Sequence, residues 1–348
     1  MIRARAGCAD ALLDDDARRV LAAVPLERLH GRRLLLAGAS GLLGSQLLAC
    51  LARAREECGV SSDVVAVIRC EPPPHVARLL DGRGIRVLRG DLTDAAFRRT
   101  LPETDFAIHA SCYAQPALFE ADPVATLSLG TEVTLDLLRR TRPDGAFLFV
   151  SSSEVYSGLA GAPFRESQIG TTTPLHPRAC YIEGKRAGEA ICDAFRRRGV
   201  AARSARVSLA YGPGTRPGDR RALNSFIEAA LTRGEIPMRD RGEALRTYAY
   251  VTDVTEVLWR ILLDGTEPVY NVGGESTTSI ADLGRLVGEL TGVPVRFPEQ
   301  AAPFPGAPED VQLDLGRTRR EFGKTSWVPL REGLARTIDW QRSLYEGR

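Results

Sequence analysis

The stretch Arg33-Leu-Leu-Leu-Ala-Gly38-Ala-Ser-Gly41-Leu-Leu-Gly44 joins a short apolar run to three glycines spaced Gly-x-x-Gly-x-x-Gly. The run predicts a buried strand, and residues 42–54 predict a helix. Glycines let the backbone turn sharply and approach a pyrophosphate, while the helix start offers unpaired N–H groups. A plain strand–helix turn can carry the same glycines, but the strand before and the helix after favour a dinucleotide site. We expect cofactor contacts from Gly38, Ser40, Gly41, Leu42, Leu43 and Gly44.

Apolar and helical segments alternate along the chain after this loop. Strands are expected at 64–68, 86–88, 106–109, 147–150 and 202–209, and helices at 131–141 and 180–198. Continuous apolar strands that alternate with helices indicate a parallel sheet covered on both faces. The expected fold class is α/β: a doubly wound Rossmann sheet followed by a smaller α/β substrate-binding domain.

The same pattern divides the chain into three regions. Residues 1–31 should form a helical extension, with a helix over 16–29 that packs on the flank of the domain. Residues 32–212, with about 247–275, should form the NAD(P)-binding domain. Residues 213–246 and 276–348 should bind substrate, with helices at 224–232, 280–290 and 330–344 and a proline-rich loop at 298–308. The strands expected at 248–251 and 269–272 fall within the NAD(P)-binding domain.

Composition excludes several classes of function. Charged residues make up 26% of the chain and the net charge is +2, too little to indicate nucleic-acid or anionic-membrane binding. Seven cysteines, an odd number without a Cys-x-x-Cys, favour reduced thiols in a cytoplasmic protein. The four histidines lack metal-ligand spacing, and no apolar run approaches the length of a membrane span or a signal peptide. We expect a soluble, metal-free protein.

The pentapeptide Tyr181-Ile-Glu-Gly-Lys185 is the strongest catalytic signal. Only Lys185 and Lys324 are lysines among 46 basic residues. A lysine four residues after a tyrosine shares its helix face, where it can lower the phenol's pKa. Ser152 lies 29 positions upstream, just after an expected strand. This arrangement predicts a tyrosine general base with a lysine and a serine beside it. A chance pair on a solvated face would look the same in isolation.

Two positions bear on the adenosine end of the cofactor. The second strand should end in an acid that binds the ribose 2′-hydroxyl, but it ends in Arg69-Cys70-Glu71. Arg69 can meet a 2′-phosphate, which favours NADP over NAD, or can stack on adenine or face solvent. Asp91-Leu92 follows the third strand, where Asp91 can accept from the adenine amino group or can cap a helix.

Together these residues resemble the extended short-chain dehydrogenase/reductase family, particularly its NAD-dependent nucleotide-sugar epimerases, dehydratases and decarboxylases. The resemblance runs from about 32 to 340 and rests on the glycine loop and on matching positions throughout: Asp91, Leu92, Ala110, Ser152, Tyr181, Lys185, the Tyr211-Gly-Pro213 turn and Arg246. It implies that the cofactor removes a hydride from a sugar carbon, usually C4. Tyr181 would take the hydroxyl proton, Ser152 would orient it and Lys185 would hold the nicotinamide ribose. Arg246 would bind the substrate's diphosphate.

The run Ser152-Ser153-Glu154-Val155-Tyr156 and the segment 177–186 resemble UDP-glucuronate decarboxylases. Dehydratases carry an acid where this chain has Ser153, and simple epimerases usually lack the glutamate at Glu154. Ser153 and Glu154 therefore complete the expected catalytic set. A substrate carboxylate needs cations, which Arg178, Arg216, Arg220 or Arg221 could provide.

Three departures from the family pattern leave the reaction open. Leu127 and Leu209 replace asparagines, and the segment 311–314 lacks an arginine found in decarboxylases. The alternatives to decarboxylation are epimerisation or 4,6-dehydration of a nucleotide sugar, net NAD(P)-dependent oxidation or reduction of another substrate, and a scaffold without turnover. His109 and Cys180 are expected to be structural. The resemblance also implies a homodimer that pairs the helix near 124–141 with the Tyr181 helix.

Overall fold

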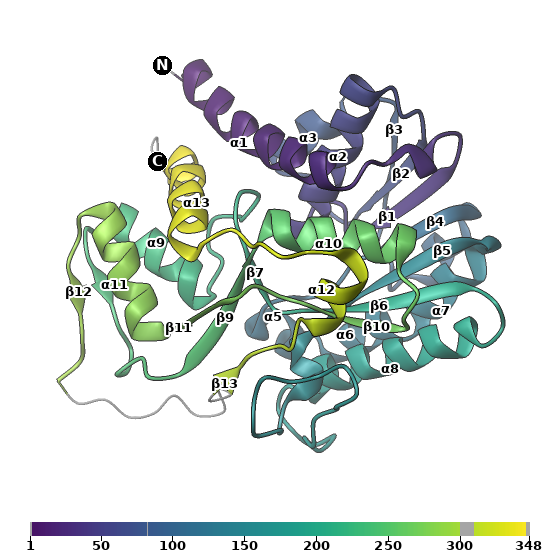
Figure 1. The fold of residues 1–348 in the computed structure, drawn as a ribbon. Coiled ribbons are helices and arrows are strands. Elements are labelled where there is room, and N and C mark those ends of the chain that lie inside the picture. Colours follow the sequence, from purple (N-terminus) through teal and green to yellow (C-terminus); the bar gives the residue numbers. More distant parts are fainter. Residues whose placement is uncertain (1, 82, 300–309, 346–348) are drawn as a thin grey trace.

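A seven-stranded parallel sheet forms the centre of the protein in a computed structural model that describes residues 2–81, 83–299 and 310–345 (Figure 1). The strand order is β10-β6-β5-β4-β1-β2-β3, which confirms the expected doubly wound α/β class. The strands are β1 (Arg33–Ala37), β2 (Asp63–Ile68), β3 (Ile85–Arg89), β4 (Thr104–His109), β5 (Thr141–Ser152), β6 (Ala201–Val207) and β10 (Val269–Val272).

Alternate residues of each strand point to two separate hydrophobic layers. Leu34 and Leu36 face one layer and Leu35 and Ala37 the other, as the two-residue period of a strand requires. The first layer is covered by α2 (Leu42–Cys58), α3 (Pro74–Leu80) and α10 (Val251–Asp264). The second is covered mainly by α6 (Pro123–Gly130), α7 (Glu132–Arg140) and α8 (Ala179–Arg196). Both faces are thus buried, which explains the continuous apolar strands.

The helix expected from 131 to 141 is α7, which runs from Glu132 to Arg140. The separate helix α6 precedes it and ends at Gly130, because Thr131 has the non-helical angles φ −112° and ψ −80°. The short helices α4 (Ala95–Arg99) and α5 (Pro116–Ala121) follow β3 and β4, and the 3₁₀ turn η2 (Ser153–Tyr156) follows β5 directly. None of the helices within the described ranges is long and apolar enough to span a membrane.

The N-terminal helix differs from the expectation of a helix over 16–29. α1 runs from Ile2 to Ala23, and a 3₁₀ turn, η1 (Glu27–Leu29), follows it. Asp16 therefore lies inside the helix, fully buried, where it accepts hydrogen bonds from Tyr250 and Arg336. The hydrogen bonds from these two residues, which are distant in sequence, offset the cost of burying the Asp16 carboxylate. α1 thus contacts both α10 and the C-terminal helix α13 (Leu330–Tyr345). It links the domain of the seven-stranded sheet to a smaller C-terminal lobe (Figure 1).

A smaller lobe is built on a four-stranded sheet. β9 (Leu245–Tyr250) lies at its centre and pairs with β7 (Leu209–Tyr211), β11 (Ser276–Ser279) and β13 (Asp310–Val311). β8 (Ile236–Pro237) and β12 (Val295–Arg296) form a second, two-stranded sheet. The helices of this part are α9 (Ala222–Arg233), α11 (Ile280–Thr291) and α13, whereas α12 (Gly316–Phe322) packs against β10 and α10 of the larger domain. The expected proline-rich loop at 298–308 lies, from residue 300 on, outside the described residues.

Candidate active site

The glycine loop between β1 and α2 cannot accommodate side chains at two of its glycines. Gly38 has φ +85°, and a Cβ there would lie 2.7 Å from the backbone carbon of Ala110 at the end of β4. A Cβ on Gly44 would lie 2.2 Å from the Gly38 carbonyl oxygen. Gly41, the N-cap of α2, provides no side-chain cap for the first N–H groups of that helix. This close, open-ended turn fits the pyrophosphate of NAD.

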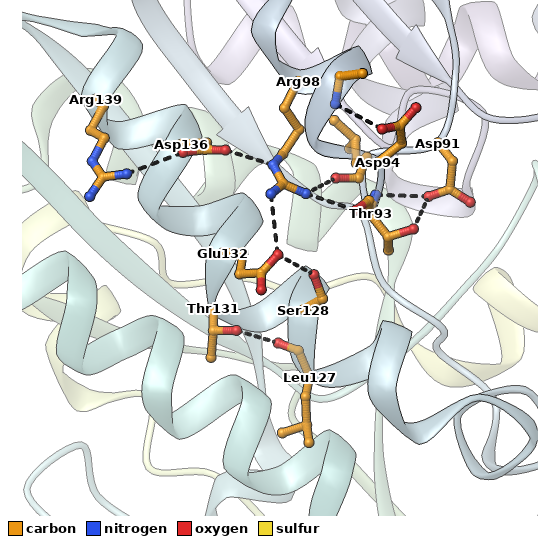
Figure 2. Close-up of polar contacts among 12 residues, drawn as sticks. Asp91, Thr93, Asp94, Arg98, Leu127, Ser128, Thr131, Glu132, Asp136 and Arg139 are labelled. Atoms are coloured by element: carbon orange, nitrogen blue, oxygen red, sulfur yellow. Dashed lines mark hydrogen bonds and ion pairs between the residues drawn. The ribbon is translucent and has the colours of Figure 1, made fainter.

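A buried arginine holds the turn that follows β3, as Figure 2 shows. Arg98 on α4 donates to the carbonyl oxygens of Leu92 and Thr93 at 2.8 and 3.0 Å. Its guanidinium is held in turn by Asp136 and Glu132 of α7, at 2.6 and 3.2 Å. Asp91 Oδ1 accepts from both the backbone N–H and the hydroxyl of Thr93, each at 2.8 Å. Asp91 is thus held within its own turn rather than acting as a cap of α4, which is Asp94.

Arg69 and Arg216 both lie near the cofactor loop. Arg69 directly follows β2 and donates to the Tyr113 hydroxyl, with its guanidinium 4.9 Å from the Tyr113 ring centre. Arg216, which is predicted to contact substrate, donates from Nη2 to the carbonyl oxygen of Ser40 at 2.5 Å. This contact brings the small lobe's 213–221 loop onto the glycine loop, which sequence spacing could not indicate.

Tyr181 and Lys185 lie one turn apart on α8, and both are buried. Lys185 Nζ donates to the Val150 carbonyl oxygen at 2.7 Å, which anchors it against β5, and lies 5.6 Å from the Tyr181 ring centre. Tyr181 and Lys185 are therefore not a chance pair on a solvent-exposed helix face. Burial raises the pKa of the Tyr181 phenol, while its hydrogen bond with Ser152 and the charge of Arg178 act in the opposite direction. Burial thus opposes ionisation of the phenol, whereas these two neighbours favour it.

The turn after β5 places the remaining expected residues close to Tyr181. Ser152 ends β5 and caps η2 by accepting from the Glu154 N–H at 3.2 Å. Glu154 Oε1 pairs with Arg178 Nη2 at 2.7 Å, both side chains being about four-fifths buried, with exposed fractions of 20%. The Arg178 guanidinium lies 5.7 Å from the Phe119 ring centre, and that ring stacks on Tyr181 at 4.9 Å. Ser153 lies in the same turn, half-buried.

A buried polar network beneath this turn was not anticipated. Arg206 on β6 forms a bidentate pair with Glu189 of α8 and also donates to the Tyr156 hydroxyl at 2.8 Å. Tyr156 in turn donates to Asn271 on β10 at 2.7 Å, and Ser151 donates to Glu189 at 2.6 Å. The sequence carried a partial signal, because Glu189 lies four residues after Lys185 on the same helix face. Its partner on β6 becomes adjacent only through the fold.

The arginine expected at the diphosphate lies in the small lobe. Arg246 is on β9, opposite Thr278 of β11 and Val311 of β13. Burial raises the pKa of Tyr248 to about 12, and the charges of Arg246 and Arg221 both oppose this shift. The two guanidinium groups therefore lie in the same region around Tyr248. Arg221 is paired with Asp219 at 2.5 Å.

His109 and Cys180 have the structural surroundings expected of them. His109 Nε2 lies 2.8 Å from the Leu129 carbonyl oxygen, which requires a proton on that nitrogen. Burial lowers the pKa of His109 to about 4, so the ring is neutral at physiological pH. The Cys180 thiol donates to the Phe119 carbonyl oxygen at 3.4 Å. Neither side chain is placed as an acid, base or nucleophile by these contacts.

Comparison with known proteins gives consistent matches. The sequence profile of the NAD dependent epimerase/dehydratase family matches residues 34–273. A UDP-glucuronic acid decarboxylase of Arabidopsis thaliana is 29% identical over 305 residues, 87% of this chain and 86% of that protein. The crystal structure of DesIV, a dTDP-glucose 4,6-dehydratase of Streptomyces venezuelae with NAD bound, has a TM-score of 0.75 at 25% identity, covering 89% of this chain and 97% of that one. MoeE5 in complex with UDP-glucuronic acid and NAD has a TM-score of 0.71 at 26% identity, covering 89% and 99%.

Proposed function

The chain belongs to the NAD dependent epimerase/dehydratase family, and from this premise we propose that it oxidises a nucleotide sugar at C4 and decarboxylates UDP-glucuronate. The observation that carries the choice of substrate is the Glu154–Arg178 ion pair. The pair fixes the Arg178 guanidinium over the Phe119 ring, and this ring stacks on Tyr181. A glucuronate carboxylate needs such a cation close to the reacting carbon.

Three residues perform the oxidation in this proposal. Bound NAD supplies the hydride acceptor for C4 and later the hydride donor. Tyr181 takes the proton of the C4 hydroxyl, and Ser152, hydrogen-bonded to the phenol, orients both oxygens. Lys185, anchored to Val150, keeps a positive charge beneath the phenol and favours its ionised form during transfer.

The second half of the reaction uses the same groups. The 4-keto sugar is a β-keto acid, so the C5–C6 bond can break with loss of carbon dioxide, and its electron pair passes to the C4 oxygen. Tyr181, whose pKa burial raises, then carries the proton and donates a hydrogen bond to that oxygen. A proton adds at C5, and reduction at C4 completes a cycle in which the sugar loses only carbon dioxide.

A nucleotide-sugar 4-epimerase is the second candidate. The segment 311–314 favours it, because this segment lacks an arginine found in decarboxylases. Dehydration at C6 is less well supported, since Ser153 replaces the expected acid and lies half-buried without a carboxyl group. Net oxidation of another substrate would consume the dinucleotide stoichiometrically.

Incubation of the purified protein with UDP-glucuronate and catalytic NAD tests these proposals. Mass spectrometry should detect a UDP-pentose and released carbon dioxide, and Tyr181→Phe should abolish both. An isomer of unchanged mass would instead support epimerisation, and absence of any product would contradict both proposals. Arg178→Ala should raise KM for UDP-glucuronate about tenfold or more, since it removes a charge-assisted contact. The same variant should change KM for UDP-glucose far less.

We also propose that the protein is a homodimer that pairs through the α5–α6 surface and the start of α8. Large apolar side chains are exposed on this face, namely Leu118, Val124, Leu127 and Leu175. They surround a hollow lined by Pro123, Cys180 and neighbouring residues. Light scattering on the purified protein should give a dimer mass, and Val124→Glu should shift it to the monomer mass without loss of NAD binding.

A further inference from the structure

The outer end of β2 lacks a carboxylate that is free to bind the cofactor's ribose. Ile68, the last residue of β2, is buried, and Arg69 and Cys70 follow it. Glu71, the first acid after the strand, pairs with Arg89 of β3 at 2.6 Å. In dinucleotide-binding sheets an acid at this position accepts the ribose 2′-hydroxyl, whereas an arginine accommodates a 2′-phosphate. The charge at this end of β2 is therefore the reverse of that expected for the unphosphorylated cofactor.

Arg69 lies at the correct place in the fold for such a contact. The N–H groups of Gly38 and Ala39 both approach the Val67 carbonyl oxygen at 3.3 Å, so the glycine loop rests on the end of β2. Arg69 is two residues beyond that carbonyl, and its side chain is exposed. The Tyr113 ring and hydroxyl hold the guanidinium in one orientation. A guanidinium held in this way retains further N–H donors for a phosphate.

Arg216 supplies a second positive charge to the same edge from the other lobe. Its Nη2 donates to the Ser40 carbonyl oxygen within the glycine loop. Burial and then the charge of Arg216 lower the pKa of His75 at the start of α3, so the guanidinium lies near the segment that follows β2. Arg69 and Arg216 therefore approach the expected ribose position from two sides.

From this arrangement we infer that Arg69 and Arg216 form a subsite for the 2′-phosphate of NADP(H), so that the protein binds the phosphorylated dinucleotide at least as tightly as NAD(H). A phosphate dianion matches two guanidinium groups, whose N–H donors form charge-assisted hydrogen bonds with its oxygens. Of the acids in this region, Glu71 forms an exposed ion pair with Arg89, and Asp91 accepts hydrogen bonds from Thr93. The subsite is separate from the residues proposed to act on the sugar.

Direct binding measurements test this subsite independently of turnover. Titration calorimetry of the full-length protein should give a dissociation constant for NADPH equal to or below that for NADH, and adenosine 2′,5′-bisphosphate should bind more tightly than 5′-AMP. Arg69→Ala should weaken NADPH binding about tenfold or more while changing NADH binding little, since one charge-assisted contact is lost. Arg216→Ala should act in the same direction. Arg69→Asp should reverse the preference toward NADH.

Arg285→Ala is the matched control, because it removes an equal charge from α11 in the small lobe and should leave both dissociation constants unchanged. Arg69 is exposed, so its variants should keep the wild-type melting temperature. Weaker binding of NADPH than of NADH by the wild-type protein would overturn the inference. An equal loss of affinity for both dinucleotides in Arg69→Ala would overturn it as well.

Discussion

Gly130 and Gly184 face each other where α6 crosses α8, and alanine substitutions at the two positions should have opposite effects. A Cβ on Gly130 would lie 2.3 Å from the Gly184 carbonyl oxygen and 2.6 Å from its carbonyl carbon. Both obstacles are backbone atoms, which cannot rotate away, so the helices would have to separate by roughly 1 Å to restore ordinary contact. A Cβ on Gly184, by contrast, would meet nothing closer than the Thr126 carbonyl oxygen at 3.5 Å.

The expected magnitudes follow from this difference. Overpacking costs about 1–3 kcal/mol, and rigid neighbours place Gly130→Ala near the upper end, so its free energy of unfolding should fall by about 3 kcal/mol. Gly184→Ala relieves the entropic cost of a glycine inside a helix and should gain about 0.5–1 kcal/mol. Gly184 also lies between Tyr181 and Lys185 on α8, and a displacement of about 1 Å at a reacting group can reduce kcat about a hundredfold.

Urea unfolding followed by circular dichroism measures both free energies, and NAD-dependent turnover of UDP-glucuronate measures the effect on the site. Gly130→Ala should unfold at lower urea and lose turnover, while Gly184→Ala should match or exceed the wild type in stability. Equal destabilisation by the two substitutions would refute the close helix contact. So would a Gly130→Ala protein of wild-type stability.

The polar groups buried around the site give further predictions. Glu189→Gln leaves the Arg206 charge buried without its carboxylate, so the free energy of unfolding should fall by about 3–5 kcal/mol. Glu183→Gln on the same helix, where the Glu183 side chain is 34% exposed, should cost less than about 1 kcal/mol; comparable losses would contradict the assigned burial. The pKa of His109 is about 4 in the folded protein and 6.5 in its ordinary state, so the unfolded chain takes the proton first and stability is lost as the pH falls from 6.5 toward 4. His109→Gln keeps an N–H donor for Leu129 and does not titrate, so urea unfolding at pH 7 and pH 5 should show the wild type losing about 2 kcal/mol more than the variant; equal losses would exclude a neutral buried His109.

The alternation of strands and helices could be predicted from the sequence, because the patterns that indicate each of them involve neighbouring residues. The apolar run before Gly38 and the glycine spacing each involve neighbouring residues, and β1 and the start of α2 lie where they were expected. Tyr181 and Lys185 could likewise be placed on one helix face from their separation alone. The start of α1 was predicted wrongly: the helix begins at Ile2, and Asp16 lies buried inside it. Its burial depends on Arg336, which is 320 residues away.

The fold class, the glycine loop and the Tyr181–Lys185 pair follow from the sequence alone, because the physics of each acts over a few residues. Which charges meet depends on the folded chain. Arg216 contacts Ser40, 176 residues away, and Arg206 pairs with Glu189 beneath the active-site turn. Such pairings depend on how sheets and helices bring distant segments together, and a charged side chain alone does not indicate its partner. The same reason makes the cofactor's adenosine end, framed by Arg69 and Arg216, a property of the folded chain.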